Sequence, residues 1–268
     1  MKLEAQEIET IDSIKDNSII LAYRGSIAHG MYIPNTDPHS IDDIDLMGIS
    51  IPSIDHYFAL KSFGSRGTKE IKKDRLDIVI YEFKKFIGLL KNGNPNVLSL
   101  LWLEPNFYLK LSPEGEYLIQ NRHLFANKNV YFSFVGYAKA QFNKMTSQAF
   151  KGYMGQKRKE LVQKFGYDTK NAAHLIRLLR MAVEFLTSGN LKVFRDIDSS
   201  ELLAIKKGGW SLEEVKEESG RLFKLADEAY IRSSLPSNPD SEKIDNLCIE
   251  ILNMYFGPIA QSARALGS

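Results

Sequence analysis

Hydrophobic residues follow a two-residue or continuous pattern in three short segments of the first half of the chain. Residues 18–23 lead into a Gly-Ser turn, residues 43–50 alternate, and residues 76–81 are strongly β-branched. These patterns predict three strands, because successive side chains of a strand point to opposite faces of a sheet. We expect a loop over residues 31–40, which are rich in turn formers, and an irregular connection before the third strand.

A helical period of apolar positions governs most of the remaining chain. The first 15 residues and residues 82–91 show it, and from about Asn127 onward it is almost continuous. Several helix ends are recognisable from their capping residues. We expect a stop at Asn92-Gly93-Asn94-Pro95, a helix from the cap Asp168 to Ser188-Gly189-Asn190, a capping box at Ser211 and Glu214, and a last helix over 241–256.

Strands that come early and helices that come late predict an α+β fold. We expect a sheet-bearing domain over residues 1–126, followed by an all-helical domain over residues 127–268. A chain of 268 residues is long enough for one large domain or two small ones.

Composition narrows the class of protein. Its 44% hydrophobic and 25% charged residues are typical of a soluble globular chain, and no apolar run reaches the roughly 18 residues that a membrane span requires. The first ten residues, MKLEAQEIET, are acidic and lack an apolar signal core. Cys248 is the single cysteine, which excludes an internal disulfide and any multi-cysteine zinc site. These features favour the cytoplasm and no membrane partner, and they leave the oligomeric state open.

Charge is distributed unevenly along the chain. Residues 139–180 contain ten Lys or Arg against two acids, a local charge of +8, which leaves −6 for the remainder of a chain whose total is +2. Such a segment can serve an anionic partner, either a nucleoside triphosphate or a nucleic acid. A solvated helix face explains it equally well.

Three acids stand beside apolar strand residues, where carboxylates are costly to desolvate. Asp43 and Asp45 are two apart and therefore share one face of their strand, and Asp77 lies near the start of the next predicted strand. Neighbouring carboxylates are tolerated when a cation lies between them, and hard oxygen ligands suit Mg²⁺ or Mn²⁺. If the two strands are adjacent, the three acids converge at one sheet edge and can hold two metal ions.

The Gly25-Ser26 turn could hold phosphates. Glycine permits close backbone approach, and the serine offers a hydroxyl and an N–H. Further along, Lys170, His174 and Arg177 are spaced i, i+4 and i+7 and form one basic stripe of a helix. A basic stripe that faces the acids could grip a triphosphate and neutralise departing pyrophosphate.

The strings AYRGSIAHG, DDIDLMGI and RLDIVIYEFKKF together resemble the DNA polymerase beta-type nucleotidyltransferase superfamily. More narrowly, the chain is similar to predicted nucleotidyltransferases associated with RNA ligases, with further matches at KNAAHLIRLLRMAVEFLTSGNL, ELLAIKKGGWSLEEV and LPSNPD. The resemblance covers roughly residues 18–240. It implies a nucleotidyltransferase-type mixed sheet, metal at Asp43, Asp45 and Asp77, and nucleotide phosphates at Gly25, Ser26 and the Lys170–Arg177 stripe.

The chain departs from the family pattern at one place. Sixteen residues separate Ser26 from Asp43, where the family has a shorter connection, and Asp42 stands where a serine is usual. Asp42 therefore competes with Asp43 as a ligand, and hydrophobic alternation at Ile44 and Leu46 favours Asp43.

These features predict a Mg²⁺- or Mn²⁺-dependent nucleotidyltransferase in RNA processing. It would transfer a nucleoside monophosphate from an NTP to an acceptor hydroxyl and release pyrophosphate. The family's association makes RNA the expected acceptor. Two alternatives remain: a glycosyltransferase that uses the Asp-x-Asp pair on a nucleotide sugar, and a catalytically silent RNA-binding protein.

Overall fold

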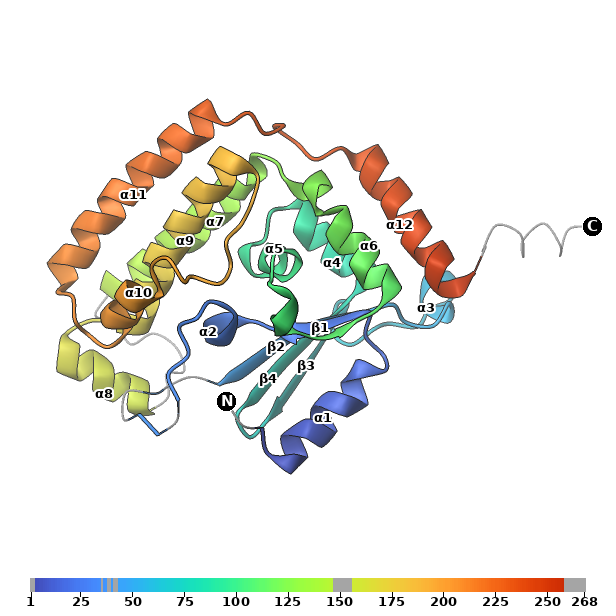
Figure 1. Ribbon diagram of the computed structural model, residues 1–268, viewed down its shortest axis with the longest axis horizontal. Helices are drawn as coiled ribbons and strands as arrows, with labels where there is room; N and C mark the ends of the chain where they lie inside the picture. The colour runs from blue at the N-terminus through green and yellow to red at the C-terminus, as the bar shows by residue number, and fades with distance from the viewer. Residues whose placement is uncertain (1–2, 35, 38–39, 41–42, 147–155, 258–268) are drawn as a thin grey trace, which may run out of the picture.

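The structure is a computed structural model that describes residues 3–257, apart from residues 35, 38–39, 41–42 and 147–155 (Figure 1). It is a mixed fold, with a sheet built from the first part of the chain and helices that dominate the rest. Within the residues described, no helix combines the length and the apolar character needed to cross a membrane.

The sheet has five strands in the order β3-β4-β2-β1-β5. β2 and β4 run parallel, whereas β1 is antiparallel to β2 and β5, and β3 is antiparallel to β4. The two parallel strands are apolar almost throughout because helices cover both of their faces. The strand bounds are β1 Ile20–Tyr23, β2 Ile44–Ser50, β3 Thr68–Lys73, β4 Leu76–Glu82 and β5 Tyr108–Leu111.

Helices precede, interrupt and follow the strands. The α-helices are α1 Ala5–Lys15, α2 Gly25–Ala28, α3 Asp55–Phe58, α4 Phe83–Lys91, α5 Pro95–Leu101, α6 Pro113–Gln120, α7 Asn129–Thr146, α8 Gln156–Phe165, α9 Thr169–Ser188, α10 Ser199–Lys206, α11 Leu212–Arg232 and α12 Ser241–Phe256. Two short 3-10 helices are η1 Pro105–Phe107 and η2 Arg122–Phe125.

Capping residues place the helix ends where the sequence predicts them. The Asp168 side chain accepts a hydrogen bond from the Asn171 backbone N–H at 3.1 Å and starts α9. Gly189 ends that helix in the left-handed conformation with φ 71°, which glycine adopts without strain. Ser211 and Glu214 form both bonds of a capping box at the start of α11.

Several elements of the structure were not among those expected from the sequence. The irregular connection expected before β4 contains α3 and the strand β3, a largely exposed edge strand that pairs only with β4. β5 is the opposite edge strand and is likewise not fully buried. Pro95, read as part of a helix stop, also occupies the first turn of α5, where Asn94 caps it.

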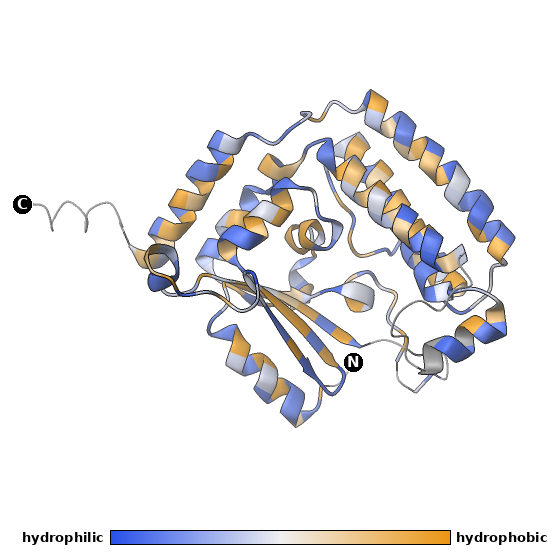
Figure 2. Ribbon diagram, turned by 180° about the vertical axis from the view of Figure 1, so that it is seen from behind, coloured by the Kyte–Doolittle hydropathy of each residue, from blue (hydrophilic) through white to orange (hydrophobic). Residues whose placement is uncertain are grey.

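A continuous apolar core joins the sheet to the later helices. It includes Met47 of β2, Phe86 of α4, Phe134 of α7, Leu178 of α9 and Ile244 of α12. Figure 2 shows the central strands as largely apolar ribbons beneath these helices. Because this core crosses residue 126 without interruption, the division into domains 1–126 and 127–268 stays a prediction.

A smaller core lies on the other face of the sheet, which α1 covers (Figure 1). Ile11 of α1 packs there with Leu21, Leu46 and Ile78 from the three central strands. Burial of these residues fixes the register of β2, since a slip of one residue would turn its acids inward.

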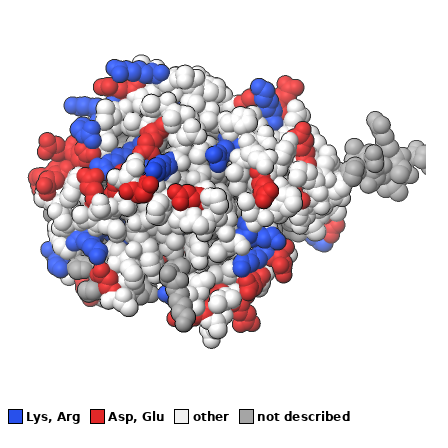
Figure 3. Space-filling view, viewed as in Figure 1, with Lys and Arg blue, Asp and Glu red and all other residues white. Residues whose placement is uncertain are grey.

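Surface charge does not gather into one field on the face shown in Figure 3, where Lys and Arg are interspersed with Asp and Glu. Residues 147–155 of the basic segment 139–180 lie outside the described residues. On this face, charge alone marks no nucleic-acid surface.

Candidate active site

A cavity of about 220 Å³ lies where α2, β2, α5, α9 and α10 meet. Six of the eight residues predicted for the site line it. Segments separated by more than 140 residues therefore converge on one small space. The six are Gly25, Ser26, Asp45, Lys170, His174 and Arg177.

Two of the three predicted acids are direct neighbours. Asp45 and Asp77 are register partners in the parallel pair β2 and β4. Asp43 precedes β2 and is exposed, although its charge still contributes to raising the pKa of Asp45. Within the described residues, no three His, Cys, Asp or Glu side chains group as a complete metal cage. Asp42 lies outside the described residues.

Arg24 contacts both neighbouring acids. Its Nη2 is 3.3 Å from Asp77 Oδ1 and 3.7 Å from Asp45 Oδ1, while Lys72 Nζ is 3.7 Å from Asp77 Oδ2. Desolvation raises the pKa of Asp45 to about 6, and the charges of Arg24 and Lys170 oppose that rise. The carboxylate pair is thus a cation site that the protein fills with its own guanidinium.

The acid pair fits a divalent metal on the chemistry of its donors. Mg²⁺ is typically held by one or two carboxylates together with substrate phosphates, and keeps several waters. Asp45 and Asp77 supply two carboxylates, and the cavity beside Asp45 leaves room for phosphates. A complete cage of protein ligands is not needed for such a site.

The turn after β1 brings backbone close to the acids. Gly25 has φ 63°, and a Cβ at this position would collide with Asp45 Oδ2, so only glycine fits. The Arg24 backbone N–H donates to Asp45 O at 2.9 Å and fixes the turn against β2. Ser26 Oγ is buried without a hydrogen-bond partner among the described residues, which leaves a hydroxyl ready for a ligand oxygen.

The opposite wall of the cavity is one face of α9. Lys170, His174 and Arg177 all line it, as their spacing predicts. Arg177 is 6% exposed, and within the described chain no carboxylate lies within ion-pair distance of it. Burial lowers the pKa of Arg177 to about 9, so it stays protonated at neutral pH. Its Nη1 instead contacts Met181 Sδ at 3.0 Å, a weak acceptor.

His29 is a buried member of the site. Its Nδ1 lies 3.0 Å from Val193 O, and desolvation together with the charge of Arg177 holds its pKa well below the usual range. The ring is therefore neutral at pH 7. The tautomer that donates Nδ1–H to Val193 leaves Nε2 as an acceptor and gives Arg177 no acceptor at Nδ1, 3.4 Å away.

Besides His29, three further polar lining residues carried no prediction: Arg24, Asn96 and Lys206. Arg24 directly precedes the Gly-Ser turn, which is the one signal that could have found it. Asn96 of α5 and Lys206 of α10 come from helices whose approach to the cavity no local pattern encodes. The buried Lys206 ammonium donates to Met31 O at 2.9 Å.

Comparison with known proteins gives one family. Residues 2–249 match the RNA repair pathway DNA polymerase beta family. No curated protein matches the chain. A crystal structure of a nucleotidyltransferase-like protein from Exiguobacterium sibiricum 255-15 is 10% identical, covers 84% of this chain and 73% of its own, and has a TM-score of 0.28. A TM-score this low supports no conclusion about this chain.

Proposed function

The chain belongs to the RNA repair pathway DNA polymerase beta family, and on that premise we propose that it is a metal-dependent nucleotidyltransferase. It transfers a nucleoside monophosphate from an NTP to a hydroxyl of an RNA acceptor and releases pyrophosphate. The substrates are thus one NTP and one RNA end.

One observation carries the proposal. Asp45 and the buried guanidinium of Arg177 line one cavity. Asp45 belongs to a carboxylate pair with Asp77 that suits a cation, whereas the described residues supply no carboxylate for Arg177. A metal-bound triphosphate has both charges that this arrangement needs. The two acids would hold its metal, and Arg177 and the Ser26 hydroxyl would hold its phosphates.

Asp45 and Asp77 would hold Mg²⁺ or Mn²⁺. When bound, the metal supplies Lewis acidity and neutralises charge on the phosphates. The protein's own groups position the reactants: Ser26 Oγ–H donates to a phosphate oxygen, and Arg177 neutralises the departing pyrophosphate. Lys170 and His174 extend the same wall.

The acceptor hydroxyl loses its proton to Asp77 as its oxygen bonds to the α-phosphorus. The bond from the α-phosphorus to the bridging oxygen breaks, and pyrophosphate leaves with that electron pair. Because Arg24 contacts both carboxylates, it would have to move away for Asp45 and Asp77 to hold a metal.

The decisive experiment incubates purified protein with each labelled NTP, Mg²⁺ or Mn²⁺, and RNA. We expect RNA-dependent labelling and pyrophosphate release with at least one NTP. Asp45→Asn and Asp77→Asn should each lower the rate by about 100- to 1,000-fold, as loss of a preorganised charged group does. Asp74→Asn is the matched control, since this exposed residue has φ 53°, which asparagine tolerates.

A catalytically silent RNA-binding protein is favoured by one specific feature, because Arg24 already neutralises both acids. That alternative predicts RNA binding that does not change with Mg²⁺ or Mn²⁺ and no consumption of any NTP. Such a result would replace the enzymatic proposal. A nucleotide-sugar transferase would instead consume UDP-sugar and leave Gly25 and Ser26 without a role.

A further inference from the structure

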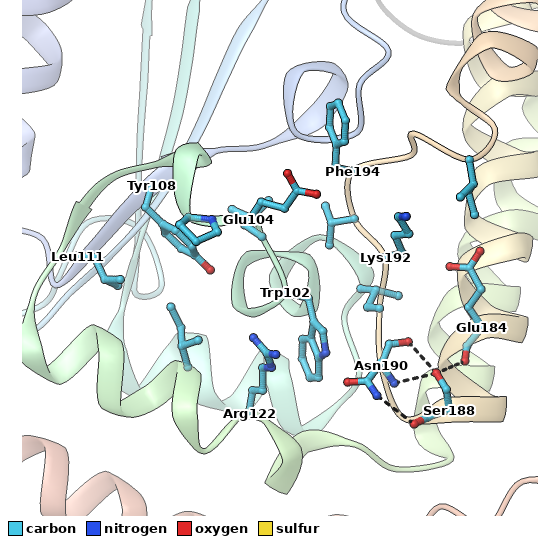
Figure 4. A pocket seen from close by; sticks show the side chains of 16 residues that line it. Trp102, Glu104, Tyr108, Leu111, Arg122, Glu184, Ser188, Asn190, Lys192 and Phe194 are labelled. Atoms are coloured by element: carbon cyan, nitrogen blue, oxygen red, sulfur yellow. Dashed lines mark hydrogen bonds between the residues drawn. The ribbon is translucent and has the colours of Figure 1, made fainter.

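A second, larger pocket of about 940 Å³ opens beside the candidate active site (Figure 4). Residues 102–122, from the end of α5 to the start of η2, form one side of it. The end of α9 and the connection over residues 188–197 form the other. None of the residues that line it lines the nucleotide cavity.

Three aromatic side chains reach this pocket from different segments: Trp102 after α5, Tyr108 of β5 and Phe194 of the connection (Figure 4). Two of the three rings pack against aromatic rings of the core. The Trp102 ring meets Phe185 edge-on at 5.4 Å between centroids, and Phe194 packs against Phe107 at 5.5 Å. The aromatic surface is therefore held in place before any ligand arrives.

The charges of the lining are largely neutralised within the protein. Both carboxylate oxygens of Glu184 accept from Arg195 at 2.7 Å, and Lys192 pairs with Asp196 at 2.6 Å. Arg122 lies 5.4 Å over the Trp102 ring and donates to Leu101 O at 3.0 Å. A phosphate would find no buried cation in need of an anion, so the lining favours an uncharged, flat group.

A hydrogen-bonding edge accompanies the flat surface. Trp102 is 8% exposed, and its indole Nε1 is buried without an acceptor among the described residues. Native structures rarely leave such a donor unsatisfied. Asn190 lines the other side of the pocket, and its amide Nδ2 donates to Ser188 O at 3.3 Å. A nucleobase combines what the pocket offers, because it has a flat ring for stacking and carbonyl or ring-nitrogen acceptors at its edge.

The space between the two pockets is a cavity of about 40 Å³ bordered by Leu103, His29 and Asn96, against about 220 Å³ for the cavity that would hold the NTP. So small a passage does not admit a base from an NTP held in that cavity. The wall is thin: Val193 lines the aromatic pocket and its carbonyl accepts from His29 in the other. The occupant must be a second molecule that lies close to the site of transfer.

We infer that this aromatic pocket, lined by Trp102, Tyr108 and Phe194, binds one unstacked base of the single-stranded RNA acceptor. The inference rests on the proposed function for the identity of the strand, and on the pocket's own residues for the base. Phosphates of the same strand would pass over the surface, because the cavity between the two pockets has a volume of only about 40 Å³.

Tryptophan fluorescence tests the inference directly, because the chain has two tryptophans. In the Trp210→Phe variant of the full chain, Trp102 is the sole reporter. We expect saturable quenching when short single-stranded RNA is added without NTP or metal. RNA anisotropy measured in parallel shows when the protein is saturated, and unchanged Trp102 emission at saturation would overturn the inference.

Phe194→Leu keeps apolar volume but removes the flat ring. It should weaken RNA binding about fivefold or more, the lower end of what one base–aromatic stack gives. Ile197→Ala, at the 62% exposed rim, is the matched control and should change affinity by less than about twofold. Equal losses in both variants would count against a stacked base.

Two ligands separate the possible sources of the quenching. An abasic strand of equal length should bind more weakly and should not quench Trp102. A free nucleoside monophosphate should quench only at much higher concentration, and quenching as tight as that of the strand would overturn the assignment to RNA. Calorimetry of NTP binding to Phe194→Leu should give the wild-type value. NTP binding that is absent in both proteins while the strand still quenches would remove the proposed function and keep the pocket.

Discussion

Helix α9 carries two arginines, three residues apart, in opposite surroundings. Arg180 reaches three carboxylates, Asp198 at 3.0 Å, Glu201 at 2.6 Å and Glu218 at 3.2 Å, which raise its pKa. Arg177 is more deeply buried, and burial lowers its pKa. One helix thus has a fully neutralised cation outside the cavity and an uncompensated one inside it.

The difference separates a structural role from a binding role. Carboxylates around Arg180 tie α9 to α10 and α11 and leave nothing for a ligand to do. A buried charge without a partner is costly, because desolvation is not repaid within the protein. Arg177 therefore indicates a cavity that binds an anion from outside the protein, whereas Arg180 forms structural ion pairs between helices.

The largest effect is expected from removing the ion pairs of Arg180. Arg180→Met leaves three acids without their shared cation and should lower the free energy of unfolding by about 3 kcal/mol, the lower end for breaking a buried pair, since Arg180 is 16% exposed. Urea unfolding measures it. NTP affinity of the folded variant should match the wild type, and a selective loss of NTP binding would contradict the division of roles.

Arg177→Met should weaken ligand binding without lowering stability. Relief of an uncompensated buried charge should leave the stability equal to or above that of the wild type. Triphosphate affinity should fall by about 1.5–3 kcal/mol, the range for hydrogen bonds to charged groups. Calorimetry with NTP gives the loss, and adenosine, which has no phosphates, should bind both proteins equally. Unchanged triphosphate affinity would remove Arg177 from the site.

The carboxylate side of the cavity gives a pH test. The pKa of Asp45 is raised to about 6, so between pH 4 and 6 the folded state holds a proton that the unfolded chain has lost. Stability therefore falls as pH rises through that window, by about 2 kcal/mol. The melting temperature of metal-free Asp45→Asn should not fall between pH 4 and 6. The Asp74→Asn control should show the same fall as the wild type. Parallel curves for wild type and Asp45→Asn would contradict the assignment.

The smallest effect concerns Arg24. Arg24→Met removes the guanidinium that competes with a metal, and partly exposed ion pairs of this kind contribute up to about 1 kcal/mol, so Mn²⁺ affinity should rise by up to about fivefold. Mn²⁺ binding without NTP measures it. Lys72→Met is the matched control, since Lys72 is 75% exposed and should matter less. Weaker Mn²⁺ binding in Arg24→Met would make the arginine a helper of the metal and not its competitor.

The sequence predicts best what depends on neighbours in the chain. Strand patterns place Asp45 and Asp77 each in a predicted strand, while the pairing of the two strands comes from the structure. Capping residues fix both ends of α9. Spacing also brings Lys170, His174 and Arg177 to one face. Nothing in that spacing distinguishes Arg177 from Arg180. The acids that pair with Arg180 and not with Arg177 lie 18 to 38 residues beyond Arg180 in the sequence.

Edge strands and distant contacts are where sequence reasoning fails. β3 reads as polar because it is exposed, and hydrogen bonds to β4 alone make it a strand. Lys206 joins the site only through the packing of α10 against α9, a contact that no local pattern reports.

The order of the site along the chain has a consequence for how the protein is made. Arg24, Asp45 and Asp77 all emerge from the ribosome about a hundred residues before Arg177, and chains fold from the N-terminus while synthesis continues. During that interval the wall that would receive phosphates does not exist. Once β2 and β4 pair, Arg24, which precedes both acids in the chain, can offset their charges before Arg177 has been synthesised.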